Sequence, residues 1–253
     1  METSKERIIE IRSVVYETAG FRILDGIDLS VFEGEVLILL GESGCGKTTT
    51  LKLINRLLDP TTGDVFVEGK NTTDWGAIAL RRRIGYVLQE AGLFPHYTVE
   101  QNIGLVLNLH GQDLNLTRHR VEEMLELVGL DPVKFASRFP HELSGGQRQR
   151  IGVARALASD PSIVLLDEPF GALDVITRTN LQKEFARLVR ELGKTAVFVT
   201  HDLREAMLLG SKIALLEKGR VVFYGEPSEF SASDVPLAKA YLETVQDIPS
   251  ISV

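Results

Sequence analysis

The chain has 253 residues, of which 44% are hydrophobic, so it can bury a full core as one large domain or a domain with a subdomain, and a largely disordered protein is excluded. A net charge of −7 argues against binding nucleic acid through a broad basic surface, since such binding depends on Lys and Arg. Cys45 is the single cysteine, which excludes an intramolecular disulfide and fits a reducing compartment.

The N-terminal stretch lacks the apolar core and the small-residue cleavage site of a secretion signal. No apolar run in the chain reaches membrane-spanning length. We therefore expect a protein that does not span a bilayer alone and that works at a membrane only through a partner.

The first part of the chain predicts three strands, at residues 8–15, 27–32 and 36–40. The third is a near-continuous apolar run, which is typical of a buried strand. Residues 62–70, TGDVFVEGK, place turn residues around Val65 and Val67 and predict a hairpin-like excursion that belongs with these early strands.

A glycine-rich segment, GESGCGKT, follows the buried strand directly and matches G-x-x-x-x-G-K-[ST], with a helix-like run at 49–58 after it. Its glycines let successive N–H groups point at phosphate oxygens, and the helix adds its positive end. Lys47 can reach the outer phosphates, and the Thr48 hydroxyl suits Mg²⁺. The order of Lys and Thr after the last glycine disfavours a turn without a ligand. The predicted nucleotide-binding set here is Gly41, Glu42, Ser43, Gly44, Cys45, Gly46, Lys47, Thr48 and Thr49.

Gln89 follows the apolar segment 84–88, and its neutral amide could coordinate Mg²⁺ or the attacking water. The next residues, through Tyr97, include the apolar Leu93, Phe94 and Pro95. This loop could receive a helix from a membrane subunit, because an exposed apolar patch is a common partner signature. Packing within a helical subdomain is the open alternative.

Residues 93–159 have a helical pattern and predict an inserted α-helical subdomain. Within it, a helix is predicted from four apolar residues at helical spacing: Val121, Met124, Leu125 and Val128. Gly129, directly after them, is a suitable residue to end that helix.

The segment LSGGQ, residues 143–147, leads into the helix-like run QRQRIGVARALA, and the two share Gln147. The Ser144 hydroxyl and the N–H groups of Gly145 and Gly146 predict an anion-binding helix start, and we add them, with Gln147, to the nucleotide-binding set. A simple helix cap without a ligand is the open alternative.

From residue 163 onward strands and helices alternate: strands are predicted at 163–166, 196–200 and 213–216, and helices at 177–192 and 203–209. The helix at 177–192 carries one apolar face: Leu181, Phe185, Leu188 and Leu192. This rhythm predicts a parallel sheet flanked by helices, and so an α/β fold. The tail at 247–253 is expected to be loosely held.

Two acids end the apolar strand in IVLLDEP, where ligands of open parallel sheets collect. Asp167 is suited to hold Mg²⁺ through water, and Glu168 is suited to orient the attacking water or accept its proton. His201 ends another strand and could donate a hydrogen bond to the terminal phosphate, although a lone His there is usually structural.

The order of GESGCGKT, Gln89, LSGGQ, IVLLDEP, GALD at 171–174 and His201 resembles that of the ATP-binding subunit of ATP-binding cassette (ABC) transporters, over nearly the whole chain. The resemblance implies a P-loop NTPase core with a mainly parallel sheet, an antiparallel β subdomain and an inserted helical subdomain. It implies one nucleotide-binding domain over residues 1–246 with the helical insertion at about 93–159. ATP and Mg²⁺ are the implied cofactors.

In that family, the LSGGQ of one subunit closes over ATP held by the phosphate loop of another. By resemblance, Ser144 to Gln147 act in trans, Asp174 lies at the dimer seam, and Tyr16 stacks on adenine. Phe21 is a second candidate for the adenine contact, and a core position is the open alternative for Tyr16. The implied catalytic residues are Lys47, Gln89, Glu168 and His201, with Thr48, Gln89 and Asp167 at the metal.

Within the family, the stretches 51–63, 80–103, 139–158 and 170–178 are most similar to subunits that drive uptake of quaternary amine osmoprotectants such as glycine betaine, choline or carnitine. Val175 stands where those relatives usually have Pro. Many of them also carry a C-terminal pair of small regulatory domains, and we expect this chain to work without ionic-strength sensing by such an appendage.

The implied partners are a second ATP-binding subunit, transmembrane permease subunits and, indirectly, an extracytoplasmic solute-binding protein, with no nucleic acid. The implied location is the cytoplasmic face of the cell membrane. Two copies would meet head to tail around two ATP molecules, and hydrolysis would release them.

Rival functions fit less well. DNA-repair and chromosome ATPases with the same head carry a long coiled coil before LSGGQ, but this chain has no sustained heptads there. Translation-associated ATPases usually place two cassettes in one chain. A nucleotide switch without hydrolysis is disfavoured by Glu168.

Overall fold

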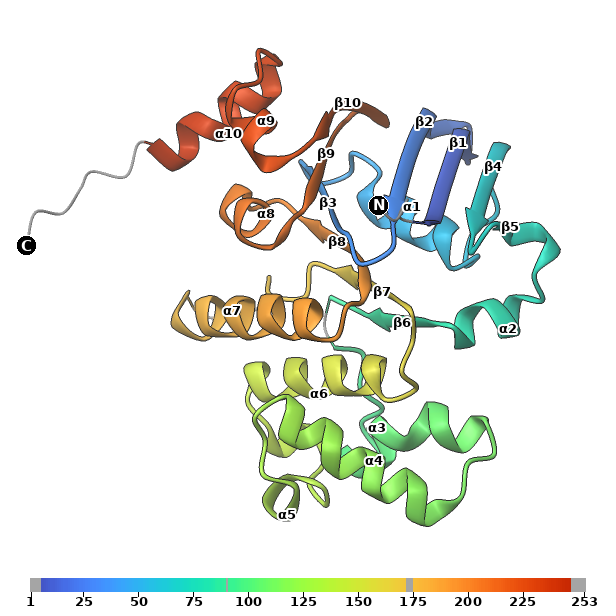
Figure 1. Ribbon diagram of the computed structural model, residues 1–253, viewed down its shortest axis with the longest axis vertical. Coiled ribbons are helices and arrows are strands. Elements are labelled where there is room, and N and C mark those ends of the chain that lie inside the picture. The colour runs from blue at the N-terminus through green and yellow to red at the C-terminus, as the bar shows by residue number, and fades with distance from the viewer. Residues whose placement is uncertain (1–5, 90, 172–174, 247–253) are drawn as a thin grey trace, which may run out of the picture. The chain divides into compact units, whose positions relative to one another are not determined.

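The computed structural model describes residues 6–89, 91–171 and 175–246. The chain forms two compact units, Met1–Ala77 with Thr195–Val253, and Ile78–Lys194. Each unit contains both strands and helices (Figure 1).

The first unit begins with an antiparallel sheet in the order β2-β1-β4-β5. Its strands are β1 (Arg7–Thr18), β2 (Phe21–Phe32), β4 (Thr62–Val67) and β5 (Lys70–Asn71). Ile11 pairs with Leu29 on one side and Val65 on the other, and all three are buried, so one face of the sheet supplies core. The predicted strands and the hairpin-like excursion are confirmed. Glu68 and Gly69, both with positive φ, form the tight turn between β4 and β5.

The second sheet of this unit has the order β10-β9-β3-β8. Its strands are β3 (Val36–Gly41), β8 (Thr195–Thr200), β9 (Lys212–Glu217) and β10 (Arg220–Gly225). β3 pairs in parallel with β8 and β9, and every one of its residues is buried, as its apolar run predicts. β10 pairs antiparallel with β9.

Helices cover this sheet. α1 (Lys47–Ile54) contacts β2 and β4 of the antiparallel sheet and also β3 and β8, so it lies between the two sheets. α8 (Leu203–Leu209) packs on β3 and β8. Three elements at the end of the chain were not predicted: β10 and the two helices after it, α9 (Pro227–Ser231) and α10 (Pro236–Gln246).

The second unit contains a parallel pair of strands, β6 (Ile84–Val87) and β7 (Ile163–Asp167). Its helices are α3 (Val99–Leu109), α4 (Leu114–Leu127), α5 (Pro132–Phe135), α6 (Gly145–Leu157) and α7 (Val175–Glu191), and α2 (Ala77–Arg82) leads into it. α3, α4 and α6 pack against one another, and α6 also packs on β6. Two short 3₁₀ turns complete the elements, Thr72–Asp74 in the first unit and Pro140–Glu142 in the second.

The helical pattern is confirmed in α4, where Val121, Met124 and Leu125 are buried and Gly129, at φ +70°, follows the helix end. Two details differ. The helical pattern does not begin at Leu93, because α3 starts at Val99 behind the capping residue Thr98. α7 ends at Glu191, so Leu192 lies outside it and is 40% exposed.

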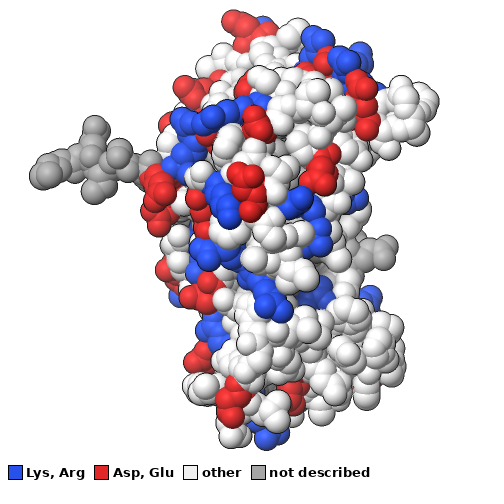
Figure 2. Space-filling model, turned by 90° about the vertical axis from the view of Figure 1, so that its right-hand side faces the viewer, with Lys and Arg blue, Asp and Glu red and all other residues white. Residues whose placement is uncertain are grey.

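The predicted fold class is confirmed: the chain is α/β, with parallel strands in both units, an antiparallel sheet and a group of helices. Among residues 6–89, 91–171 and 175–246, no helix combines the length and apolar character needed to cross a bilayer. The face drawn in Figure 2 carries basic and acidic side chains intermixed. Ion pairs of the chain include Arg12 with Glu10 and Arg220 with Asp25.

Close packing of α6 on β6 gives a testable consequence. A Cβ at Gly85 would lie 2.4 Å from the backbone oxygen of Ala156. Because this oxygen belongs to the backbone of α6, it cannot move aside as a flexible side chain could. Gly85→Ala should lower the free energy of unfolding by about 1–3 kcal/mol through overpacking, measured by urea denaturation. Ile78→Ala, at a side chain that is 69% exposed, is the control and should stay within about 0.5 kcal/mol of the parent. Equal stabilities of the two variants would contradict this packing.

Candidate functional site: a phosphate loop and paired strand ends

The phosphate loop extends from the buried end of β3 to the start of α1. Gly41 has φ +154°, and a Cβ there would lie 2.4 Å from the Leu216 backbone oxygen. Gly46 caps α1 at φ +109°, and a Cβ there would lie 2.4 Å from the Leu24 side chain. Both positions therefore require glycine for backbone conformation and for space. Glu42, Ser43 and Gly44 are exposed between them.

Lys47 is the charged group of this loop. Its Nζ donates to the carbonyl oxygens of Gly41 and Glu42, both at 2.7 Å, although the residue is only 4% exposed. The loop thus closes on an ammonium group, and phosphate oxygens are acceptors of the same kind as these carbonyls. Thr48 and Thr49 follow in the first turn of α1, and both are half-buried.

Cys45 lies inside the loop, with its Sγ 3.9 Å from Lys47 Nζ. Burial raises the pKa of this thiol, against the lowering effect of the Lys47 charge. A thiol with a raised pKa stays protonated and is a poor nucleophile, so this environment does not activate Cys45 for reaction.

Tyr16 lies on the same side of the antiparallel sheet as the loop. It pairs with Leu24 across β1 and β2, and directly paired side chains share a face. Leu24 is the side chain that a Cβ at Gly46 would strike, so the face of Tyr16 is the face toward the loop. Phe21 pairs with Thr18 at the far end of the strands and is 71% exposed. The geometry favours Tyr16 of the two aromatic candidates.

His201 directly follows β8, in the same unit as the loop. Leu40 of β3 pairs with Thr200 of β8, so Gly41 and His201 leave neighbouring parallel strands at the same edge. Thr200 anchors this corner, because its hydroxyl donates to the buried Glu205 at 2.5 Å and accepts from the Asp202 N–H at 2.9 Å. His201 itself is exposed.

The second unit repeats this arrangement with β6 and β7. Val87 pairs with Leu166, so Gln89 and Glu168, which follow the two strands, lie at one edge. Asp167 is 7% exposed, and the Tyr86 hydroxyl donates to its Oδ2 at 3.5 Å. Burial, and then the Asp167 charge, raise the pKa of Tyr86, which keeps that phenol a donor.

Glu168 has an unusual backbone. Its φ of +43° is in the left-handed region, which is costly for a residue with a side chain. A tight turn maintains it, since the Gly171 N–H donates to the Glu168 carbonyl at 3.2 Å. The Glu168 side chain is half-buried, whereas Asp167 at the end of the preceding strand is buried.

LSGGQ forms the start of α6. Ser144 is the cap: its Oγ accepts from the Gln147 N–H at 3.2 Å, and the Gln147 Oε1 accepts from the Ser144 N–H at 2.9 Å. This reciprocal capping box is the structure expected of a simple helix cap, the alternative that the sequence left open. Gly145 and Gly146 occupy the first helical positions, where N–H groups have no partner within the helix.

Two residues that the sequence analysis did not single out fix the loop after Gln89. Arg155, on α6 and 9% exposed, donates from Nη1 to Gly92 O at 2.8 Å and from Nη2 to Ala91 O at 2.7 Å. Burial lowers the pKa of this guanidinium, which remains charged. An arginine within the apolar stretch of a helix was the signal available in the sequence.

Asn102 is the second such residue. It is fully buried on α3, its Oδ1 accepts from the Phe94 N–H at 2.8 Å, and its Nδ2 donates to the carbonyls of Phe94, Tyr97 and Thr98 at 2.9–3.2 Å. These bonds hold the loop that displays Phe94, His96 and Tyr97 as a group of contacting rings. The helix that Asn102 belongs to therefore sets the shape of the exposed loop.

The structure thus gathers the predicted residues in two groups. The first unit holds Tyr16, the loop Gly41 to Thr49, and His201. The second unit holds Gln89, Asp167 and Glu168 at one strand edge, and Ser144 to Gln147 at the start of α6. Asp174 and the tail at 247–253 lie outside the described residues.

The chain belongs to the ABC transporter family, whose model matches residues 24–171. Among known relatives, it is 50% identical over 221 residues to the glycine betaine/carnitine/choline transport ATP-binding protein OpuCA of Bacillus subtilis, which covers 87% of this chain and 58% of that protein. It is also 50% identical over 211 residues to the osmoprotectant import ATP-binding protein OsmV of Salmonella typhimurium, covering 83% of this chain and 55% of that protein. The chain thus spans somewhat more than half the length of these relatives.

Solved structures agree with this assignment. The ATP-binding cassette MJ0796, in a dimeric post-hydrolysis state bound to ADP and Pi, is 35% identical with a TM-score of 0.78 over 87% of this chain and 99% of that chain. CbiO1 from Clostridium perfringens is 28% identical with a TM-score of 0.82 over 96% of this chain and 97% of that chain.

The contacts of Arg155 give a prediction for this site. Arg155→Met leaves the Ala91 and Gly92 carbonyls without their donor and should lower the free energy of unfolding by about 2–5 kcal/mol, measured by urea denaturation. Arg120→Met is the matched control, because Arg120 also donates to two carbonyls, of Leu157 and Ala158, but at 3.4 and 3.0 Å from a more exposed side chain. A loss for Arg155→Met no larger than that for Arg120→Met would contradict the described role.

Proposed function

We propose that this chain is the ATP-hydrolysing, nucleotide-binding subunit of an ABC importer, and that it drives uptake of a quaternary amine osmoprotectant such as glycine betaine, choline or carnitine. The observation that carries the proposal is its 50% identity to ATP-binding proteins named for transport of those compounds and for osmoprotectant import. The substrate itself would contact other subunits, so this part of the proposal depends on relatedness and not on the site.

The first unit would bind the nucleotide. The N–H groups of residues 41–49 would donate to the phosphates, and Lys47 would exchange its two carbonyl acceptors for outer phosphate oxygens. Tyr16 would stack on adenine, which its position on the loop face of β1 supports.

The donors available for Mg²⁺ are all oxygens: the Thr48 hydroxyl, the Asp167 carboxylate and the Gln89 amide. Oxygen donors of this kind fit a hard cation that also binds substrate phosphates, so the residues present suit the ion. When bound, Mg²⁺ would neutralise charge on the phosphates.

Glu168 would orient the attacking water and accept its proton, and His201 would donate to the terminal phosphate. The strained backbone of Glu168 supports the first role, because left-handed conformations at residues with side chains concentrate at functional sites. The position of His201 beside the start of the phosphate loop supports the second.

ATP binding would bring two such subunits together, each covering the other's nucleotide with Ser144, Gly145, Gly146 and Gln147, and with Asp174 at the seam. The dimeric state of MJ0796, which is 35% identical, supports this part. The capping box of Ser144 and Gln147 leaves the first N–H groups of α6 available to an anion.

The chain would act at the cytoplasmic face of the membrane with transmembrane permease subunits and, through them, a solute-binding protein. The loop with Phe94, Pro95, His96 and Tyr97 is the proposed permease contact. Phe94 is 42% exposed, and Asn102 holds the loop in shape, so the ring would be displayed without first being ordered.

Glu168→Gln tests the proposed chemistry. It removes the proton acceptor but keeps the shape of the side chain, so steady-state ATP turnover should fall by about a hundredfold or more while ATP binding persists. Phosphate release measures the first quantity, and sedimentation velocity with MgATP should show a dimer for the variant. Glu184→Gln, on the exposed surface of α7, is the control and should turn over ATP like the parent. Unchanged turnover in Glu168→Gln would remove Glu168 from this role.

Phe94→Ala tests the permease contact. In the assembled transporter, loss of the exposed ring should lower substrate uptake by about tenfold, because a buried aromatic anchor is commonly worth that much to an interface. ATP turnover of the isolated subunit should stay within about twofold, since Asn102 binds only the backbone of the loop. Leu57→Ala, at a side chain that is 47% exposed in the first unit, is the control for uptake. Normal uptake with Phe94→Ala would contradict the assignment.

A further inference from the structure

A small apolar cavity lies within the second unit, apart from every residue assigned above to ATP or Mg²⁺. It has a volume of about 40 Å³ and opens to solvent on one side. Its lining comes from the end of α4, from α6, from α7 and from the segment after β7: Leu127, Val128, Gln149, Arg150, Val153, Phe170, Leu181, Glu184 and Phe185.

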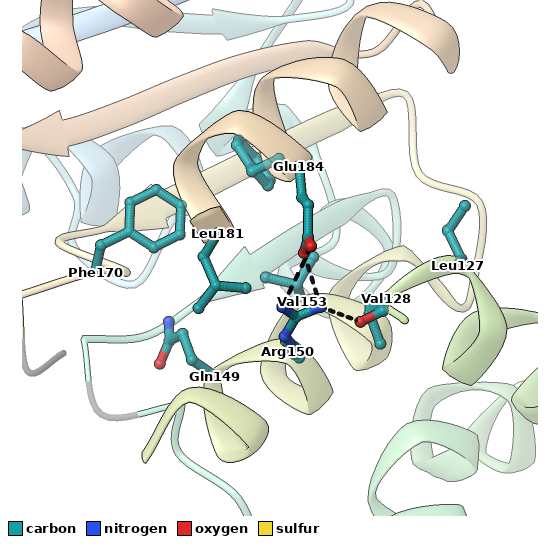
Figure 3. A pocket seen from close by; sticks show the side chains of 9 residues that line it. Leu127, Val128, Gln149, Arg150, Val153, Phe170, Leu181 and Glu184 are labelled. Atoms are coloured by element: carbon teal, nitrogen blue, oxygen red, sulfur yellow. Dashed lines mark hydrogen bonds and ion pairs between the residues drawn. The ribbon is translucent and has the colours of Figure 1, made fainter. Parts of the chain in front are cut away.

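The walls of the cavity are hydrocarbon. Val153 and Leu181 are buried, and the rings of Phe170 and Phe185 meet edge to face with their centroids 6.1 Å apart. At the rim, the Arg150 guanidinium joins two helices: its Nη1 lies 2.7 Å from Glu184 Oε2 of α7 and donates to the Val128 carbonyl at 2.7 Å (Figure 3). The rim charges are therefore paired with each other.

One polar group breaks this apolar lining. Gln149 is only 5% exposed, and its Nε2 has no hydrogen-bond partner in the part of the chain that the structure describes. Figure 3 shows Gln149 beside Leu181 and Phe170, with its amide nitrogen on the side toward them. An amide donor buried without an acceptor is unfavourable, and native structures rarely keep one without a reason.

We infer that this cavity is a binding site for a small uncharged molecule that has an apolar body and one hydrogen-bond acceptor oxygen, such as a carbonyl. The oxygen would accept from Gln149 Nε2, and part of the apolar body would enter the space between Val153, Leu181 and the two phenylalanine rings, since a cavity of about 40 Å³ is too small to enclose a whole carbon ring. A charged ligand is disfavoured, because the one buried polar group is a neutral donor and the rim charges already pair.

A molecule seated there would contact α6 and α7 together. α6 begins with LSGGQ, and α7 follows the segment that starts at Glu168, so the ligand would join the helices behind two of the proposed motifs. This site does not depend on the proposed function, because binding at Gln149 requires neither ATP nor a second subunit.

The test is an NMR titration of the full chain with methyl groups labelled, using cyclopentanone and cyclopentene as probes of nearly equal shape. Cyclopentanone should shift the methyl signals of Val153 and Leu181 and should bind about three- to tenfold more tightly than cyclopentene, the difference expected of one hydrogen bond. In Gln149→Met, which keeps the length of the side chain without the donor, the two probes should bind equally.

A second variant separates binding in the cavity from binding elsewhere. Leu127→Trp, at the partly exposed rim, should block both probes, whereas Leu116→Trp on the same helix, 59% exposed and outside the lining, should leave binding unchanged. The inference would be overturned by equal binding of the two probes to the parent chain, by a preference for cyclopentanone that survives in Gln149→Met, or by binding that survives in Leu127→Trp. A cavity that holds only water would bind neither probe, and that result would also overturn the inference.

Discussion

The shape of the glycine-rich loop depends on one interaction, its closure around the Lys47 ammonium group. β3 is buried along its whole length and delivers Gly41 at a fixed place, while Gly46 starts α1 under the Leu24 side chain. Between these fixed points, Lys47 Nζ lies at 2.7 Å from two backbone oxygens. Because the anchors are core residues, the loop is shaped before nucleotide arrives, and little ordering free energy is then required on binding.

The same design recurs in the second unit, where buried strands deliver polar groups to an edge. Gln89 and Glu168 follow β6 and β7 at one edge of the strand pair, and Arg155 ties the loop after Gln89 to α6. α6 therefore has three roles: it begins with LSGGQ, clamps the loop and forms one wall of the apolar cavity. A shift of α6 would therefore move LSGGQ, the loop after Gln89 and one wall of the cavity together.

Much of this was predictable from sequence, because glycine spacing and apolar runs report directly on backbone geometry. The buried strand before GESGCGKT, the α4 pattern that ends at Gly129 and the α/β class all followed from such local rules. β10 was not predicted although RVVFYG has a strand composition, because it pairs antiparallel with β9 and so lies outside the alternation of strands and helices that predicts the parallel strands. The contacts of Arg155, Asn102 and Gln149 could not be predicted, because each depends on segments that only the tertiary fold brings together.

The most direct measurement is the affinity of the isolated chain for ATP, by isothermal titration calorimetry, in the parent and in Lys47→Ala. If the loop closes on this ammonium group to receive phosphate, the dissociation constant should rise by about ten- to a hundredfold in Lys47→Ala, as expected for loss of charge-assisted hydrogen bonds. Lys52→Ala, one turn further along α1, should bind ATP like the parent. Equal ATP affinity of Lys47→Ala and the parent would contradict the account.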